Sequence, residues 1–162
     1  MRIILGIDPG LNHTGWGIIR SHHSKLEWVA SGTLNTNSKA SLSERLLDLH
    51  QQLAEVLSQY TIDEAAIEET FVNKNALSSL KLGHARGVLM CSIMQYAIPL
   101  HEYASTKIKK SVVGVGRADK EQIMQMVKLL LPKAVIDSYD AADALAVAIT
   151  HSHYCEHKEL IS

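Results

Sequence analysis

Four carboxylates stand where a folded chain would hold them for chemistry. Asp8 closes the apolar run of "ILGIDPG" just before a Pro-Gly break, and Glu68 lies near the end of "DEAAIEE". Asp140 and Asp143 are three residues apart in "DSYDAADALAVAITH", a spacing that puts both on one face of a helix. A half-buried carboxylate is costly to ionise unless it is paired or binds a cation. We therefore interpret these four residues as metal ligands.

A structural explanation exists for the last pair, because acidic residues in a first helical turn favour the helix dipole. That explanation does not apply to Asp8 or Glu68, which end apolar strand-like segments instead of beginning a helix. Mg²⁺ prefers hard oxygen ligands and uses few carboxylates per ion, so four carboxylates suit two ions. Two Mg²⁺ ions about 4 Å apart would activate a water on one side of a phosphodiester and stabilise the leaving oxygen on the other. The expected reaction is phosphodiester hydrolysis.

Hydrophobic periodicity predicts the elements that must position these carboxylates. Strands are expected at 3–8, 14–20, 26–32, 63–69 and 98–104, the first three as an antiparallel meander, and helices at 40–60, 74–97, 105–112, 119–131 and 138–152. Ser41 or Ser43 is expected near the start of the first helix as a cap, Asn73 caps the second, and Pro132 stops the fourth. This order predicts an α/β fold with a mixed five-stranded sheet flanked by helices. Asp8 and Glu68 would then lie at the carboxyl ends of neighbouring strands.

Length and composition favour one compact domain over residues 1–162, since 46% of the residues are hydrophobic and 20% are charged. We expect a cytoplasmic protein, because no signal-peptide pattern and no apolar stretch of about 20 residues occurs. Cys91 and Cys155 are expected to be reduced thiols, with Cys91 in the core.

The charge distribution is uneven although the net charge is only −1. Residues 70–118 contain seven basic residues and one acid, Glu102, so this stretch is positive by six and the remainder negative by seven. The stretch predicts either a basic surface for nucleic-acid phosphates or the solvated faces of unrelated helices. Its basic residues are Lys74, Lys81, Arg86, Lys107, Lys109, Lys110 and Arg117.

Five motifs occur in an order that resembles the RuvC family of Holliday junction resolvases along nearly the whole chain. They read "LGIDPG", "TGWGII", "AIEETFVNKNALSSLKLGHARG", "IKKSVVGVGRADK" and "DAADALAVAITH". The resemblance implies a ribonuclease-H-like homodimer that nicks two opposed strands of a four-way DNA junction during recombination and repair. It implies two Mg²⁺ ions per subunit, replaceable by Mn²⁺, at a tetrad corresponding to Asp8, Glu68, Asp140 and Asp143. It also implies work with the RuvA-RuvB branch-migration complex.

The resemblance also implies roles for two lysines and one aromatic residue. Lys109 and Lys120 would act at the scissile phosphate, although a plain basic surface is the alternative. Phe71 would stack on an unpaired base, whereas an aromatic in such a loop is more often a core or staple residue. The remaining basic residues would contact DNA phosphates or simply be solvated.

Two other functions remain open at this point. "GIDPGLNHTG" also resembles the phosphate-binding turn of actin-like ATPases and sugar kinases, but those proteins need two such domains and 162 residues supply one. A catalytically inactive junction-binding protein is the second alternative, and the presence of all four carboxylates argues against it.

Two features receive no assigned role. The segment "HSHYCEH" contains His151, His153, Cys155 and His157, but zinc needs a specific geometry that a helix end does not guarantee, so no zinc site is predicted. Gly83 and Gly87 make one face of the predicted helix over 74–97 smooth. That face would pack either on the sheet or against a second copy of the chain.

Overall fold

The computed structural model describes residues 1–70 and 74–161, with side chains described up to residue 155. Its strands are β1 (Arg2–Asp8), β2 (His13–His22), β3 (Lys25–Asn35), β4 (Glu64–Glu68) and β5 (Leu100–Tyr103). Its helices are α1 (Leu42–Gln59), α2 (Ala76–Gln95), α3 (Ser105–Val113), α4 (Lys120–Leu130) and α5 (Tyr139–Ile161). Among the described residues, no helix has the length and apolar character needed to cross a membrane.

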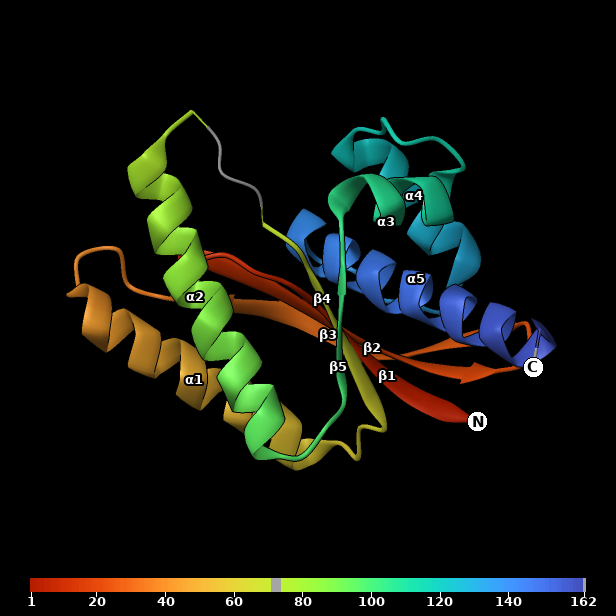
Figure 1. Cartoon of the computed structure of the whole chain (residues 1–162), viewed down its shortest axis with the longest axis horizontal. Coiled ribbons are helices and arrows are strands. Elements are labelled where there is room, and N and C mark those ends of the chain that lie inside the picture. The colour runs from red at the N-terminus through yellow and green to blue at the C-terminus, as the bar shows by residue number, and fades with distance from the viewer. Residues whose placement is uncertain (71–73, 162) are drawn as a thin grey trace.

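The five strands form one sheet in the order β3-β2-β1-β4-β5 (Figure 1). β1, β2 and β3 pair antiparallel, as the predicted meander requires, while β4 and β5 run parallel to β1. The predicted mixed five-stranded sheet flanked by helices is confirmed.

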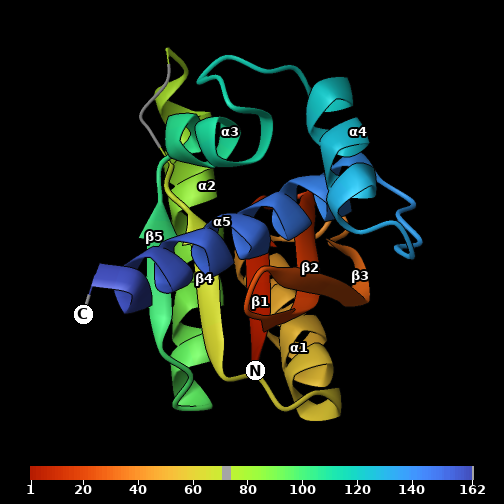
Figure 2. The same ribbon diagram turned by 90° about the vertical axis from the view of Figure 1, so that its right-hand side faces the viewer.

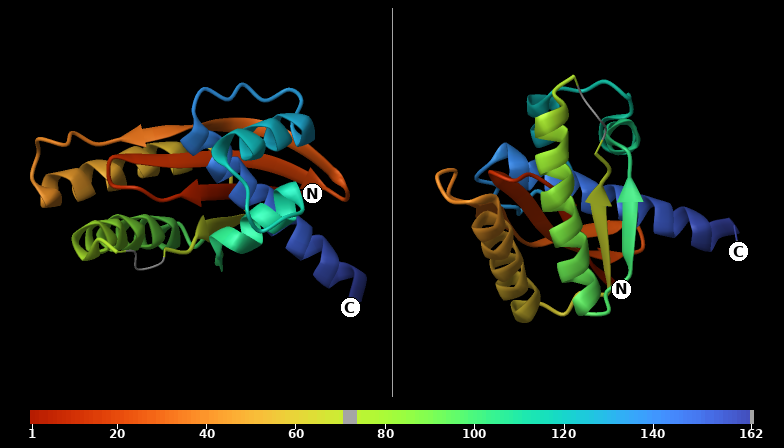
Figure 3. Two further views of the ribbon diagram at one scale, coloured as in Figure 1. Left: turned by 90° about the horizontal axis from the view of Figure 1, so that it is seen from above. Right: turned by 60° about the vertical axis from the view of Figure 1, so that its left-hand side comes forward.

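Helices cover both faces of the sheet. α1 and α2 lie side by side on one face, and α5 crosses the other face, where α3 and α4 pack against it (Figures 2 and 3). Successive side chains of a strand point to opposite faces. Leu5 and Ile7 therefore pack in the core under α1 and α2, while Ile4 packs in the core under α5. By the same alternation Gly6 and Asp8 face α5.

α5 lies directly on the sheet because the facing positions have almost no side chain. A Cβ atom added to Gly6 would lie 2.1 Å from the carbonyl oxygen of Ala144, and one added to Gly15 would lie 1.9 Å from that of Asp140. Ala144 and Ala148 of α5 are completely buried against this surface. The glycines of β1 and β2 thus set the distance at which α5 carries its carboxylates over the strands.

Several local predictions are confirmed and two are wrong. Ser41 caps α1 in a capping box with Glu44, and α4 ends at Leu130, just before Pro132. The N-cap of α2 is Asn75 rather than Asn73, which lies outside the described residues. Cys91 is exposed and not a core residue, because α2 buries the stripe of Ala85, Leu89 and Ile93 instead. Cys91 and Cys155 are not joined in a disulfide, as expected.

We expect Gly6→Ala to lower the free energy of unfolding by about 2–4 kcal/mol, because the new methyl group must push the α5 backbone away from β1. Urea unfolding followed by circular dichroism measures the change. Gly116→Ala is the matched control, since a Cβ there would meet only the carbonyl oxygen of Thr106, at 3.9 Å. That substitution should leave stability nearly unchanged or raise it slightly, because alanine lowers the conformational entropy of the unfolded chain. Equal effects of the two substitutions would show that the contact between α5 and β1 tolerates a side chain.

Candidate active site

Asp8 and Glu68 are brought together by the parallel pairing of β1 and β4. Ile7 lies opposite Ile67 in this ladder, so the next residue of each strand emerges at the same edge of the sheet. The two carboxyl groups are close enough to share a hydrogen bond. The turn after Asp8 is fixed by Thr14, whose hydroxyl donates to the carbonyl of Gly10 at 2.6 Å and accepts from its N–H at 3.1 Å.

The start of α5 is fixed by Ser138. Its hydroxyl accepts a hydrogen bond from the N–H of Ala141 at 3.0 Å and pairs with the hydroxyl of Thr33 on β3 at 2.8 Å. This pair attaches the first turn of α5 to the sheet. Asp140 and Asp143 then follow in the first turns of the helix, above the ends of β1 and β2.

The charges of the four carboxylates act on one another. Burial raises the pKa of Asp8 well above its usual value, and the neighbouring charges of Glu68, Asp143 and Asp140 raise it further. Burial also raises the pKa of Asp143 to about 6, although the ammonium group of Lys120 opposes the shift. A group of carboxylates that resists ionisation in this way fits a multivalent cation, and its all-oxygen donor set fits Mg²⁺.

A cavity of about 460 Å³ opens between these strand ends and the helices α3 and α4. Its lining brings together five of the six residues predicted to be catalytic, namely Asp8, Glu68, Lys109, Lys120 and Asp143. Asp140 is not part of the lining, but its charge acts on both Asp8 and Asp143. Lys109 is half-buried on α3, and Lys120 is exposed as the first residue of α4.

The other predicted DNA-binding residues differ in their surroundings. Arg86 donates to the carbonyl of Glu68 at 3.1 Å and forms an ion pair with Glu102, so it holds the end of β4 in place. Lys107 lies over the ring of Tyr154 at 4.3 Å. Phe71 lies outside the described residues. The remaining four are exposed: Lys74, Lys81, Lys110 and Arg117.

A second cluster of polar side chains lies on the same face of the sheet and was missed by the sequence reasoning. His151 and Cys155, four residues apart on α5, meet Glu64 of β4 and His101 of β5. The four-residue spacing of His151 and Cys155 in the sequence indicates that both lie on one face of a helix. That Glu64 and His101 join them depends on how α5 packs over the sheet. His153 is not in this cluster and bonds Ser111 at 3.0 Å. The side chain of His157 lies outside the described part of the chain.

Comparison with known proteins identifies one family over most of the chain. The family model for crossover junction endodeoxyribonuclease RuvC matches residues 4–151. The RuvC of Azorhizobium caulinodans is 54% identical over 151 residues, which cover 93% of this chain and 89% of the relative. The RuvC of Brucella anthropi is 50% identical, with 93% and 88% covered.

Solved structures agree with this relation. Thermus thermophilus RuvC in complex with a Holliday junction substrate has a TM-score of 0.89 and 28% identity, with 98% of this chain and 97% of that chain covered. Another structure of Thermus thermophilus RuvC has a TM-score of 0.85 and 28% identity, with 96% of each chain covered. The yeast mitochondrial Holliday junction resolvase, at 14% identity and a TM-score of 0.67, covering 96% of this chain and 82% of its own, shares the fold.

The raised pKa of Asp143 predicts how stability depends on pH in metal-free protein. Because its pKa rises from 3.8 to about 6 on folding, the folded state holds the proton more tightly. Its contribution to stability is therefore present at low pH and lost as the pH rises through about 6. With a chelator present, Asp143→Asn should stabilise the protein by about 1 kcal/mol at pH 7.5, after allowance for its partial exposure, and by little at pH 4.

Urea unfolding at the two pH values measures this difference. Asp137→Asn, which removes an exposed carboxylate, is the control and should have little effect at either pH. Added Mg²⁺ should stabilise the unaltered protein at pH 7.5 and reduce the advantage of Asp143→Asn. A variant that is less stable than the unaltered metal-free protein at pH 7.5 would contradict this account of the carboxylate cluster.

Proposed function

The chain belongs to the RuvC family of crossover junction endodeoxyribonucleases, and we propose that it resolves four-way (Holliday) DNA junctions at the cavity lined by Asp8, Glu68 and Asp143. The observation that carries the proposal is the meeting of carboxylates from β1, β4 and α5 with two lysines in one cavity. The reaction is hydrolysis of a phosphodiester bond in each of two opposed strands. It serves homologous recombination and DNA repair.

RuvC nucleases are metal-dependent, and we infer that Asp8, Glu68, Asp140 and Asp143 hold two Mg²⁺ ions, with Mn²⁺ able to replace them. The donors are all carboxylate oxygens. The raised pKa values of Asp8 and Asp143 indicate that nearby positive groups do not balance the negative charge of the cluster. When bound, the ions would activate the attacking water and stabilise the leaving oxygen. Asp8 and Glu68 hold their carboxylates on rigid strand ends, which keeps the ligand positions fixed.

Lys109 and Lys120 supply positive charge on the other side of the cavity. Their ammonium groups both lower the pKa of Asp143, so both act on the carboxylate cluster electrostatically. A DNA phosphate entering the cavity would lie between these ammonium groups and the carboxylates. We assign both lysines to neutralising the charge that develops on the scissile phosphate. The exposed residues Lys74, Lys81, Lys110 and Arg117 are proposed to contact the DNA backbone, as are Arg86 and Lys107 beside their internal contacts.

A homodimer suits this function, because a four-way junction offers two equivalent strands to a twofold assembly. α2 presents a smooth and mainly apolar stripe to solvent, made of Leu80, Gly83, Gly87, Cys91 and Met94. We propose that this stripe packs against the same stripe of a second copy. Each chain would contribute residues 1–162 as one nuclease domain, acting in the cytoplasm with the RuvA-RuvB branch-migration complex.

No specific observation favours the two alternative functions. The relatives are named as endonucleases, and the carboxylates required for hydrolysis are present and clustered.

We expect Asp8→Asn and Lys120→Ala to slow junction cleavage even when the protein saturates the DNA. Asp8→Asn removes a metal ligand and should slow single-turnover cleavage at least about 100-fold, while Lys120→Ala should slow it about 10- to 100-fold. Gel assays with a labelled four-way junction, Mg²⁺ and excess protein measure the rate. Binding of the junction without cleavage should persist in Asp8→Asn.

Lys81→Ala is the matched control for the lysine substitution, because Lys81 is exposed on α2 and absent from the cavity lining. This variant should cleave normally at saturation, bind junctions more weakly and show a salt dependence of log K that is smaller by about one unit. Normal cleavage by Asp8→Asn would exclude the proposed metal site. Normal cleavage by Lys120→Ala at saturation would remove only its catalytic assignment.

Gly87→Arg should convert the dimer to monomers, because it places a charged side chain in the centre of the exposed stripe of α2. Sedimentation velocity measures the mass, and a junction assay measures whether both opposed strands are cut in one binding event. Gln51→Arg adds the same charge at an exposed position of α1 and should leave a dimer. A dimer that persists in Gly87→Arg would place the subunit interface elsewhere.

A further inference from the structure

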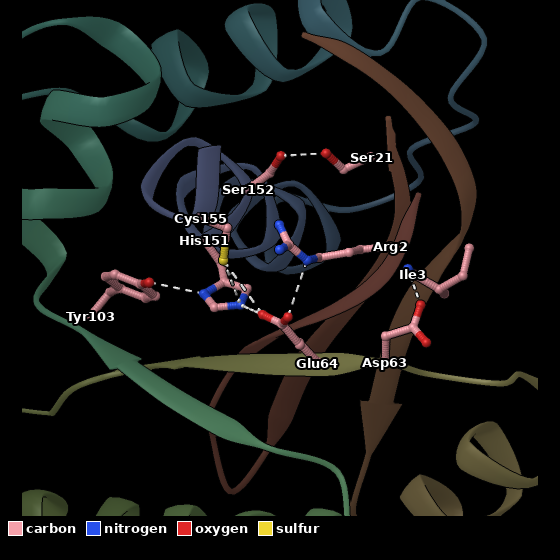
Figure 4. Close-up of polar contacts among 9 residues, drawn as sticks. All are labelled: Arg2, Ile3, Ser21, Asp63, Glu64, Tyr103, His151, Ser152 and Cys155. Atoms are coloured by element: carbon pink, nitrogen blue, oxygen red, sulfur yellow. Dashed lines mark hydrogen bonds and ion pairs between the residues drawn. The ribbon is translucent and has the colours of Figure 1, made fainter. Parts of the chain in front are cut away.

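The second cluster contains four metal-binding side chains of mixed type. Glu64, His101 and His151 each place a ligand atom within 4.8 Å of the others. The Sγ atom of Cys155 lies 3.4 Å from Oε2 of Glu64 and 3.5 Å from Nε2 of His151. Figure 4 shows the imidazole of His151, the thiol of Cys155 and the carboxylate of Glu64 pointing toward one another. The cluster thus offers one oxygen, two nitrogens and one sulfur.

Three elements bring these side chains together. Glu64 opens β4, His101 lies in β5, and His151 and Cys155 follow one another by a helical turn on α5. The alternation that sends Tyr103 into the core under α5 also sends His101 to that face. Glu64 and Glu68 are at opposite ends of β4, so the cluster lies about 13 Å along the strand from the proposed active site.

The four donor types are those of tetrahedral zinc sites, and the distances from Cys155 to Glu64 and His151 can be compared with the spacing that such a site requires. Zn²⁺ binds Cys sulfur at about 2.3 Å and His nitrogen or carboxylate oxygen at about 2.0–2.2 Å, so neighbouring ligand atoms lie about 3.3–3.6 Å apart. The two distances from Sγ of Cys155 fall in this range. Nε2 of His151 and Oε2 of Glu64 are closer, at 2.6 Å, because they share a hydrogen bond. An ion would replace the proton between them after a separation of less than about 1 Å.

Neighbouring groups already orient two of the ligands. Nδ1 of His151 pairs with the hydroxyl of Tyr103 at 2.9 Å, and Oε1 of Glu64 pairs with Arg2 at 3.3 Å, which leaves Oε2 toward the cluster. Metal-bound histidines typically donate their second ring N–H to such a partner. Burial raises the pKa of Tyr103 to about 12, so its neutral hydroxyl can accept this bond. The side chain of His151 is 1% exposed, and its orientation is therefore restricted.

We propose that Glu64, His101, His151 and Cys155 form a site for a soft divalent cation, Zn²⁺, separate from the Mg²⁺ site of the nuclease. On binding, the thiol of Cys155 releases its proton to solvent. His151 stays neutral by carrying its proton on Nδ1, next to Tyr103, while Nε2 binds the ion. The carboxylate and the thiolate then balance the charge of the ion. The ion fastens the second half of α5 to β4 and β5.

Binding of Co²⁺ and Zn²⁺ to the full chain tests this proposal. With excess Mg²⁺ present to occupy the acidic site, one equivalent of Co²⁺ should give the visible absorption of a tetrahedral site and a thiolate charge-transfer band in the near ultraviolet. Zn²⁺ should displace the Co²⁺ and raise the melting temperature. Asp143→Asn should keep both signals, since it alters only the acidic site.

His101→Ala and Cys155→Ser should each weaken Zn²⁺ binding at least tenfold, and Cys155→Ser should also lose the charge-transfer band. His101 is exposed, so its substitution leaves the core intact and circular dichroism can verify the fold. His84→Ala and Cys91→Ser remove an exposed histidine and an exposed thiol of α2 and should change nothing. Absence of a stoichiometric Co²⁺ signal, or equal binding by His101→Ala and the unaltered chain, would show that the cluster is only a hydrogen-bonded network.

Discussion

The close contact of α5 with β1 and β2 determines the rest of the structure. Gly6 and Gly15 leave no space for a Cβ atom beneath the carbonyl oxygens of Ala144 and Asp140, so the helix backbone lies on the strand backbones. Any larger side chain at these positions would lift the helix away from the sheet. Asp140 and Asp143 have short side chains. Their carboxylates can therefore approach Asp8 only while α5 lies this close to the strands. The arrangement of the candidate active site therefore depends on Gly6 and Gly15, the positions of β1 and β2 that have no side chain.

The two polar groups beneath α5 differ in how their charges are balanced. At one end of β4, Glu64 pairs with Arg2 and shares a hydrogen bond with His151, which in turn pairs with Tyr103. At the other end, Asp8 and Glu68 have negatively charged neighbours. The positive charges that act on Asp143 come from Lys120 and Lys109. Carboxyl groups with raised pKa values are ionised at neutral pH at a cost in free energy, so they lower the stability of the metal-free folded protein. A cation removes this disadvantage, which is why the acidic end has the character of a functional site.

The sequence predicted those features that depend on local patterns. Strand and helix positions follow from apolar periodicity, and the cap at Ser41 follows from a short motif. Asp8 and Glu68 were predicted to be site residues because each ends an apolar strand, and the structure places both at one edge of the sheet. Cys91 was misplaced because α2 has apolar residues all around, so periodicity does not identify its buried stripe. The cluster of Glu64 and His101 with His151 was missed because its members are separated by up to 87 residues and meet only through strand order and the crossing of α5.

The carboxylate cluster and the cluster with histidine and cysteine lie along the same helix, α5, and they differ in which metal ion they favour. Oxygen ligands alone select poorly, since Zn²⁺ outcompetes Mg²⁺ at most sites of comparable geometry. A cluster with imidazole and thiolate ligands prefers the softer ion strongly, and it lies under the same helix as the carboxylates. When Zn²⁺ is scarce, the proposed cluster would bind it first and would leave the acidic end to Mg²⁺, which is far more abundant. Because α5 is continuous from Asp140 to Cys155, fastening its second half to β4 also restricts the motion of the half that carries Asp140 and Asp143. The glycine contacts that set the height of α5 would then act together with a metal clip to keep the nuclease ligands in place.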